Sequence, residues 1–273
     1  MNTISFPKLG LEFNIDPIAL HYGNGGIHWY GIIIAVGVVL ALLLCSHIYK
    51  KHGRDPEQLL DFLIWVLPIG IVGARAYYVI FSWDAYRDDL AEIFRIWNGG
   101  LAVYGGILAG LVTALIFCRL KNINFLDFAD VAVPGLAVGQ CLGRWGNFVN
   151  GEAHGGATEL LWGMSINGSA PVHPTFLYES LWSFAGILVL LFVLRQRTSG
   201  QTFFSYWLWY GIGRFFIEGL RTDSLYTASG LRASQVVAAV SVAVGLAGVI
   251  LTEIKRHRQR RFEHCTQCED NFS

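Results

Sequence analysis

The stretch Gly139–Gly156, GQCLGRWGNFVNGEAHGG, decides how this sequence is interpreted. It places the polar side chains of Arg144, Asn147, Asn150 and Glu152 among glycines, between long apolar segments. Charged and amide side chains are costly at membrane depth, and irregular backbone is tolerated there only beside protein or a water-filled cavity. We therefore expect this stretch to be a binding site within a membrane protein, with an anionic lipid as its ligand.

The composition is that of an integral membrane protein. Of the 273 residues, 53% are hydrophobic and only 15% are charged, whereas soluble domains carry about 25% charged residues. The 9 Trp, 11 Tyr and 18 Phe suit a chain with aromatic side chains at two membrane surfaces. The formal net charge is +0, so nothing indicates a nucleic acid partner. The N-terminal residues lack the basic and apolar regions of a cleavable signal peptide.

Seven segments approach the roughly 20 apolar residues that a membrane-spanning helix needs. They lie at 28–48, 59–81, 99–118, 125–142, 176–194, 202–217 and 233–254. The prediction is an all-α integral membrane protein, a bundle of about seven transmembrane helices. Residues 1–254 form a single transmembrane domain in this interpretation, and 255–273 form a basic, polar tail. The glycine-rich residues 143–175 are expected to be a functional loop.

The lysines and arginines predict the orientation. Twelve of the 20 lie in three alternate loops and in the tail, at 49–58, 119–124, 195–201 and from Lys255 onward. The positive-inside rule therefore places the N-terminus outside and the C-terminus in the cytoplasm. Residues 139–156 and 219–232 then share the outer side of the membrane.

The sixth segment carries Tyr210, Arg214, Glu218 and Arg221 on one helical face. One interpretation is that Arg214 and Glu218 form an intrahelical ion pair that serves packing. The other is functional, because an arginine inside a membrane marks a candidate site and its planar fork suits phosphate. Arg144 likewise either snorkels to the interface or belongs to a site, and its glycine neighbours favour the site.

Other polar residues have structural alternatives as well. His173, just before the fifth segment, has a side chain suited to proton transfer, yet a structural hydrogen bond is the commoner role. Tyr30 lies at the start of the first segment, where its structural alternative is a place in an aromatic belt at the membrane surface. Tyr104 lies among glycines, where its structural alternative is a packing role. Cys265 and Cys268 form a C-x-x-C without a second pair, so a metal site there is disfavoured.

Five motifs in the chain belong together. They are HWYG at 28–31, GGLAVYGG at 99–106, GRWGNFVNGEAHG at 143–155, HPTFLYE at 173–179 and YGIGRFFIEGLR at 210–221. In this order they resemble the bacterial prolipoprotein diacylglyceryl transferase family, from Trp29 to about Val240. The resemblance implies an inner-membrane enzyme with seven spans and an outward-facing site. Such an enzyme moves diacylglyceryl from phosphatidylglycerol to the thiol of a lipobox cysteine in a prolipoprotein and releases glycerol phosphate, without a metal or cofactor.

The resemblance also implies roles for individual residues. The essential arginines of the family match Arg144 and Arg214. Its other functional positions match Tyr30, Asn147, Glu152, Gly155, Tyr210 and Glu218. One position departs, because Tyr104 stands where the family often has a histidine. Either Tyr104 substitutes for it or the proton is handled elsewhere, with His173 the nearest alternative.

Two other functions compete with this interpretation. A lipid transporter would use the same arginines to hold an anionic headgroup in transit, but inverted repeats are not visible. A structural membrane scaffold would pair its polar residues with one another, and their clustering with glycines argues against it. The enzyme hypothesis requires that Arg144 and Arg214 meet, and that acidic partners do not close them off completely.

Overall fold

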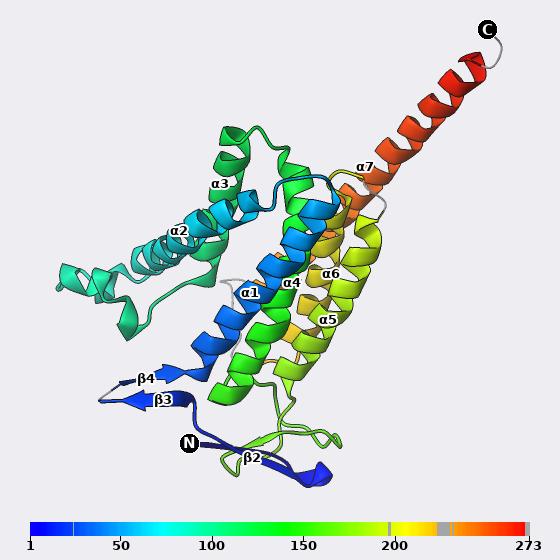
Figure 1. Ribbon diagram of the computed structural model, residues 1–273. Helices are drawn as coiled ribbons and strands as arrows, with labels where there is room; N and C mark the ends of the chain where they lie inside the picture. The colour runs from blue at the N-terminus through cyan, green and yellow to red at the C-terminus, as the bar shows by residue number, and fades with distance from the viewer. Residues whose placement is uncertain (24, 196–197, 223–229, 231, 271–273) are drawn as a thin grey trace. The chain divides into compact units, whose positions relative to one another are not determined.

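The computed structural model describes residues 1–23, 25–195, 198–222, 230 and 232–270, with side chains described as far as Arg258 (Figure 1). The helices are α1 (Trp29–Lys51), α2 (Glu57–Phe81), α3 (Val103–Leu120), α4 (Phe125–Asn150), α5 (Thr175–Leu194), α6 (Gln201–Glu218) and α7 (Ala233–Asp270). The strands are β1 (Asn2–Phe6), β2 (Leu11–Ile15), β3 (Ile18–Tyr22), β4 (Gly25–His28) and β5 (Ser165–Ile166). Short 3-10 helices lie at Pro7–Leu9, Trp83–Ala85, Leu90–Phe94 and Ile96–Asn98.

The helices have the length and surface of membrane spans. Within the described residues, 6 helices are long and apolar enough to cross a membrane, namely all except α6. Large apolar side chains on their outer faces are exposed, such as Trp65, Val72 and Ile80 of α2. Such surfaces are tolerated where lipid covers them. The chain is therefore a multi-pass membrane protein, and its helices agree with the seven predicted segments, although only six meet this criterion for a span.

Two expectations need correction. Residues 143–150, predicted to be loop, continue α4 as regular helix to Asn150. The glycines there serve close packing, because a side chain on Gly146 would collide with the ring of Tyr30 in α1. The predicted tail from 255 begins as a continuation of α7, which extends to Asp270. The strands were also not predicted, because most are only four or five residues long or, in β5, two.

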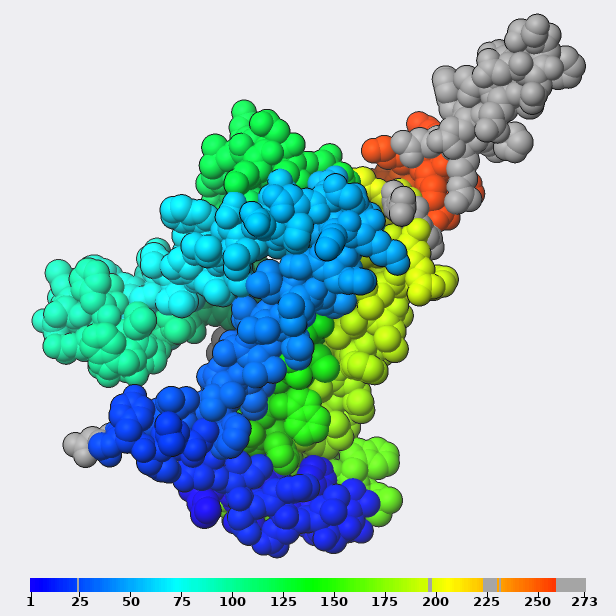
Figure 2. Space-filling model, viewed as in Figure 1, coloured from blue at the N-terminus to red at the C-terminus, as the bar shows by residue number. Residues whose placement is uncertain are grey.

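The chain divides into two compact units. The first unit comprises Met1–Leu44 and Ala129–Ser273, and the second comprises Cys45–Phe128. In the first unit, β1 pairs with both β2 and β5 in an antiparallel sheet. This sheet buries Ile4 and Phe6 against Phe176 at the start of α5. The N-terminal strands therefore cover the end of the first unit where α4 ends and α5 begins, as Figure 2 shows in dark blue.

Glycines and tryptophans bring α5, α6 and α7 close together. A side chain at Gly211 of α6 would approach the carbonyl of Ala238 in α7 to 2.8 Å, so these backbones touch. Between α5 and α6, Trp182 and Trp209 stack with ring centroids 4.5 Å apart. Each indole N–H donates to the other residue's carbonyl at 2.9 Å. These contacts fix the register in which α5 and α6 present their polar residues.

The second unit is organised by a buried arginine. Arg75 of α2 is 6% exposed, and its guanidinium donates to the carbonyls of Glu92, Ile93, Gly99 and Gly100 at 2.6–2.9 Å. These hydrogen bonds hold the segment between α2 and α3 against α2. Arg75 thus has a structural role in this unit.

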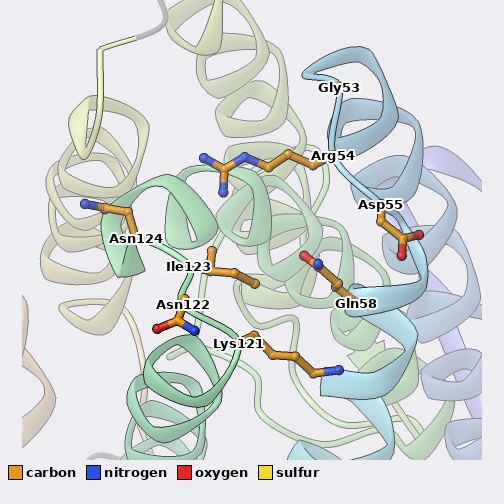
Figure 3. Close-up of a pocket in the computed structure, with 8 residues that line it drawn as sticks. All are labelled: Gly53, Arg54, Asp55, Gln58, Lys121, Asn122, Ile123 and Asn124. Atoms are coloured by element: carbon orange, nitrogen blue, oxygen red, sulfur yellow. The ribbon is translucent and has the colours of Figure 1, made fainter.

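A polar pocket of about 440 Å³ also lies in the second unit (Figure 3). Residues of the α1–α2 and α3–α4 connections line it, including Arg54 and Lys121. Both cations are already paired, Arg54 with Asp127 at 2.7 Å and Lys121 with Asp61 at 2.8 Å. The two cations that line this pocket are therefore each neutralised by a carboxylate.

Candidate active site

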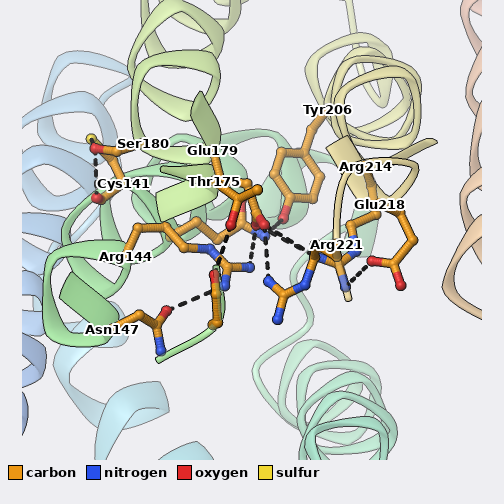
Figure 4. A network of polar contacts seen from close by, with 12 residues as sticks. Cys141, Arg144, Asn147, Thr175, Glu179, Ser180, Tyr206, Arg214, Glu218 and Arg221 are labelled. Carbon is orange, nitrogen blue, oxygen red and sulfur yellow. Dashed lines mark hydrogen bonds and ion pairs between the residues drawn. The ribbon is translucent and has the colours of Figure 1, made fainter. Parts of the chain in front are cut away.

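Three arginines of the first unit converge on one carboxylate (Figure 4). Arg144 comes from α4, Arg214 from α6 and Arg221 from the turn after α6, while Glu179 lies in the first turns of α5. Nη1 of Arg221 lies 3.2 Å and Nη1 of Arg214 lies 3.3 Å from Oε1 of Glu179. Nη2 of Arg144 forms an ion pair with Oε2. Arg144 and Arg214, more than one helix apart in the sequence, therefore meet as the sequence interpretation requires.

The predicted pair on α6 is also present. Nη2 of Arg214 lies 2.7 Å from Oε2 of Glu218, one turn later on the same helix. The carbonyl of Glu218 accepts a hydrogen bond from Arg232, which comes just before α7. The predicted Arg214–Glu218 ion pair is thus present, and it does not exclude a site, because Arg214 also contacts Glu179.

The arginines keep a route to solvent or lipid. The side chains of Arg144 and Arg214 are 26% and 17% exposed, whereas Glu179 is 9% and Glu218 only 1% exposed. The carboxylates are thus less exposed than the side chains of Arg144 and Arg214, whereas Arg221 is as buried as Glu179. Because a guanidinium has five N–H donors, each arginine has more donors than these carboxylates occupy. The acidic partners therefore leave Arg144 and Arg214 with exposed surface and with N–H donors for a further ligand.

A second branch of polar contacts leaves Arg144 along the end of α4. Its Nη1 donates to Oδ1 of Asn147 at 3.3 Å, and Nδ2 of Asn147 donates to Oε1 of Glu152 at 3.1 Å. Asn150 donates to the same carboxylate oxygen at 3.1 Å. Helical spacing puts Arg144 and Asn147 on one face, and the turn at Gly151 brings Glu152 back to them. The predicted site residues of α4 are thus brought together.

Gly155 joins three parts of the site. Its N–H donates to the carbonyl of His173 at 2.9 Å, and it forms an isolated β-bridge with Arg221. A side chain here would lie 2.7 Å from Cβ of His173 and 2.8 Å from the carbonyl of Leu220. Only glycine therefore lets this loop pass between the start of α5 and the end of α6. This is a structural reason for Gly155 at the site.

The candidate base His173 has an aromatic partner. Its Nδ1 lies 3.4 Å from the hydroxyl of Tyr178, which accepts a hydrogen bond of 2.7 Å from the indole of Trp162. The other candidate, Tyr104, is the second residue of α3 and belongs to the second unit. Its role stays a prediction from the sequence.

Two tyrosines complete the predicted set. Tyr30 lies over Gly146 at the start of α1, beside the turn that carries Arg144. Tyr210 stacks on Tyr206 with ring centroids 5.9 Å apart, one turn before Arg214. Gln140 of α4 donates to the Tyr206 hydroxyl at 2.8 Å and so ties α6 to α4. A cavity of about 10 Å³ adjoins this pair, which is room for about one water molecule.

The sequence interpretation did not assign a role to Glu179, the residue on which the arginines converge. It placed Arg221 on the polar face of the sixth segment without counting it in the site. The rule that selected the arginines would also have selected Glu179, because a carboxylate within a membrane segment is equally costly. The side chains of Cys265 and Cys268 lie outside the described residues.

Comparisons with known proteins identify the family of this chain. Residues 17–251 match the family model described as prolipoprotein diacylglyceryl transferase. The chain belongs to this family. It is 43% identical to the phosphatidylglycerol–prolipoprotein diacylglyceryl transferase of Lysinibacillus sphaericus (strain C3-41) over 259 residues, which cover 90% of this chain and 95% of the relative. It is 48% identical to the Finegoldia magna protein of the same name over 247 residues, covering 90% and 97%. The resemblance seen in the five motifs is thus confirmed at the level of the family.

Proposed function

We propose that this chain transfers the diacylglyceryl group from phosphatidylglycerol to the thiol of the lipobox cysteine in prolipoproteins and releases glycerol phosphate. The observation that carries this proposal is the convergence of Arg144, Arg214 and Arg221 in a partly buried site. The names of its relatives support the same substrates. The protein acts in the bacterial inner membrane, with its site toward the outer face and residues 255–273 as a cytoplasmic tail.

The reaction is a substitution at carbon. The substrate thiolate attacks the glycerol C3 carbon of the diacylglyceryl group, a carbon–sulfur bond forms, and the bond from C3 to the phosphate oxygen breaks. The phosphate changes from a diester with one negative charge to a monoester with two, while the sulfur loses its charge. Because negative charge accumulates on the leaving phosphate, cations positioned there in advance lower the barrier. Arg144 and Arg214 supply these cations, and their forked donors suit phosphate oxygens.

The remaining predicted residues orient these groups. Asn147 and Glu152 extend the hydrogen-bonded chain from Arg144, and Glu218 holds Arg214. Tyr30, Gly155 and Tyr210 shape the space for the substrate. The attacking thiol belongs to the substrate, so the protein needs a group that favours the thiolate rather than a nucleophile of its own. Tyr104 and His173 are the two candidates for that group.

One experiment tests the proposal directly. The purified protein is incubated in detergent with phosphatidylglycerol and a lipobox peptide, and the peptide is then weighed by mass spectrometry. A mass gain of one diacylglyceryl group is expected, with release of glycerol phosphate. The absence of any gain while the protein stays folded would defeat the proposal. Arg144→Ala and Arg214→Ala should each lose activity, and full activity in both would remove the arginines from the mechanism.

A further inference from the structure

Glu179 occupies the centre of the site, although the proposed chemistry gives it no part. It lies near the start of α5 and is buried. Oε1 contacts Arg214 and Arg221, and Oε2 contacts Arg144 and, at 3.4 Å, Arg214. Its contacts therefore include all three arginines. It thereby connects α4, α5, α6 and the segment after α6.

The three arginines do not depend on Glu179 equally. Arg214 has a closer carboxylate, because Glu218 is 2.7 Å away while Glu179 is 3.3 Å away. Arg144 forms its ion pair with Glu179, and its other terminal nitrogen donates to the neutral amide of Asn147 at 3.3 Å. Removal of the charge on Glu179 should therefore release Arg144 first and leave Arg214 held by Glu218.

We propose that Glu179 is the positioning residue of the site and holds Arg144 and Arg221 in the orientation that receives the phosphate. The inference rests on the proposed function and deepens it. A buried carboxylate surrounded by guanidinium groups fixes their planes through charge-assisted hydrogen bonds. Each guanidinium keeps N–H donors beyond those bound to Glu179, so carboxylate and phosphate are held by the same groups at once.

This role has two opposite consequences for the kinetics. The negative charge of Glu179 opposes binding of an anionic headgroup, so its loss leaves the affinity for phosphate equal or greater. The same loss lets Arg144 move from the position where it stabilises the leaving phosphate. A shift of about 1 Å in such a group lowers the rate about 100-fold. A positioning role therefore separates kcat from KM, whereas a simple structural role does not.

The test uses the full chain in detergent with phosphatidylglycerol and a lipobox peptide. Glu179→Gln keeps the shape of the side chain and removes its charge. We expect kcat to fall about 100-fold, while KM for phosphatidylglycerol and the inhibition constant of glycerol phosphate stay equal or fall. Glu179→Asp keeps the charge but is one methylene shorter, so it should recover part of the lost kcat.

Glu253→Gln provides the matched control. Glu253 pairs with Arg256 at 2.6 Å and contacts Gln201, at the end of α6 opposite to Glu218. It is an ion-paired, partly buried glutamate in the same unit, outside the site. The same substitution here should leave kcat and KM at the wild-type values, so a loss in Glu179→Gln is not a general result of removing a paired glutamate.

Each result decides the inference. Wild-type kcat in Glu179→Gln overturns it, and so does a rise in KM that accounts for the whole loss. If Glu179→Gln does not fold, Glu179→Asp decides instead: a lowered kcat at the wild-type melting temperature supports the inference, and a wild-type kcat overturns it. Failure of the wild-type protein to modify the peptide defeats the proposed function itself and this inference with it.

Discussion

Two kinds of arginine lie within the long helices, and they are satisfied in different ways. Arg75 of the second unit donates to four backbone carbonyls and is 6% exposed. Arg144 and Arg214 of the first unit bind carboxylates and are 26% and 17% exposed. An arginine in a membrane is costly in either case. The difference shows that the partners of the guanidinium, and its access, separate a structural arginine from a candidate catalytic one.

Replacement of an arginine by lysine should lower activity in the first unit and stability in the second. Arg214→Lys keeps the positive charge but loses the planar fork that binds two phosphate oxygens. We expect kcat/KM to fall about 100- to 1,000-fold, as when one preorganised donor to a developing oxyanion is lost. The melting temperature should stay near the wild-type value, because lysine still pairs with Glu218. Peptide mass spectrometry and a thermal melt measure the two effects, and wild-type kcat/KM would contradict the phosphate-binding role of Arg214.

The two candidates for the group that accepts the thiol proton lie in different units. Tyr104 belongs to the second unit and His173 to the first. We expect one of the variants Tyr104→Phe and His173→Gln to lower kcat by about 100-fold, the usual contribution of a general base. The pH–rate profile of that variant should lose the limb that reports the base. Wild-type rates in both would show that neither side chain accepts the thiol proton.

Arg75→Lys is the counterpart in the second unit. Arg75 uses three nitrogens for four hydrogen bonds, and the single ammonium of lysine leaves at least one buried carbonyl without a donor. The expected loss is about 2 kcal/mol in the free energy of unfolding. It should appear as a lower melting temperature, with a much smaller change in kcat per folded molecule than in Arg214→Lys. A variant with wild-type stability and a lost kcat would place Arg75 in the mechanism instead.

Much of the helical architecture follows from hydropathy and local spacing. The predicted segments 59–81 and 176–194 agree within about two residues with α2 and α5. Residues 143–150 were predicted to be loop because they combine glycine with polar side chains. The structure makes them helical because their glycines pack against Tyr30, a contact between residues more than 100 positions apart. No local pattern contains that information.

In the candidate site too, contacts within one helix could be predicted from the sequence, whereas contacts between helices could not. The Arg214–Glu218 pair was predictable, since residues four apart on a helix are neighbours. The meeting of Arg144 with Arg214 was expected only through the family resemblance. Glu179 could have been selected as a carboxylate in a membrane segment, but the convergence of three arginines on it could not be predicted. These contacts cross from one helix to others, and the register of packed helices depends on side-chain fit rather than on local spacing.

The smallest expected effect concerns the segment that Arg75 holds. Asn98 donates to the half-buried Glu92 carboxylate at 2.6 Å, and this hydrogen bond, with that of Arg95, lowers the pKa of Glu92. A carboxyl group whose pKa is lower in the folded state stabilises the fold at pH values above its unfolded pKa, and this stabilisation is lost as the pH falls through the folded pKa. The melting temperature should therefore decline slightly further on acidification in the wild type than in Glu92→Gln. Equal declines of the melting temperature in the two proteins would show that the Glu92 contacts add nothing to stability. The hydrogen bonds of Arg75 would then be what holds the segment between α2 and α3.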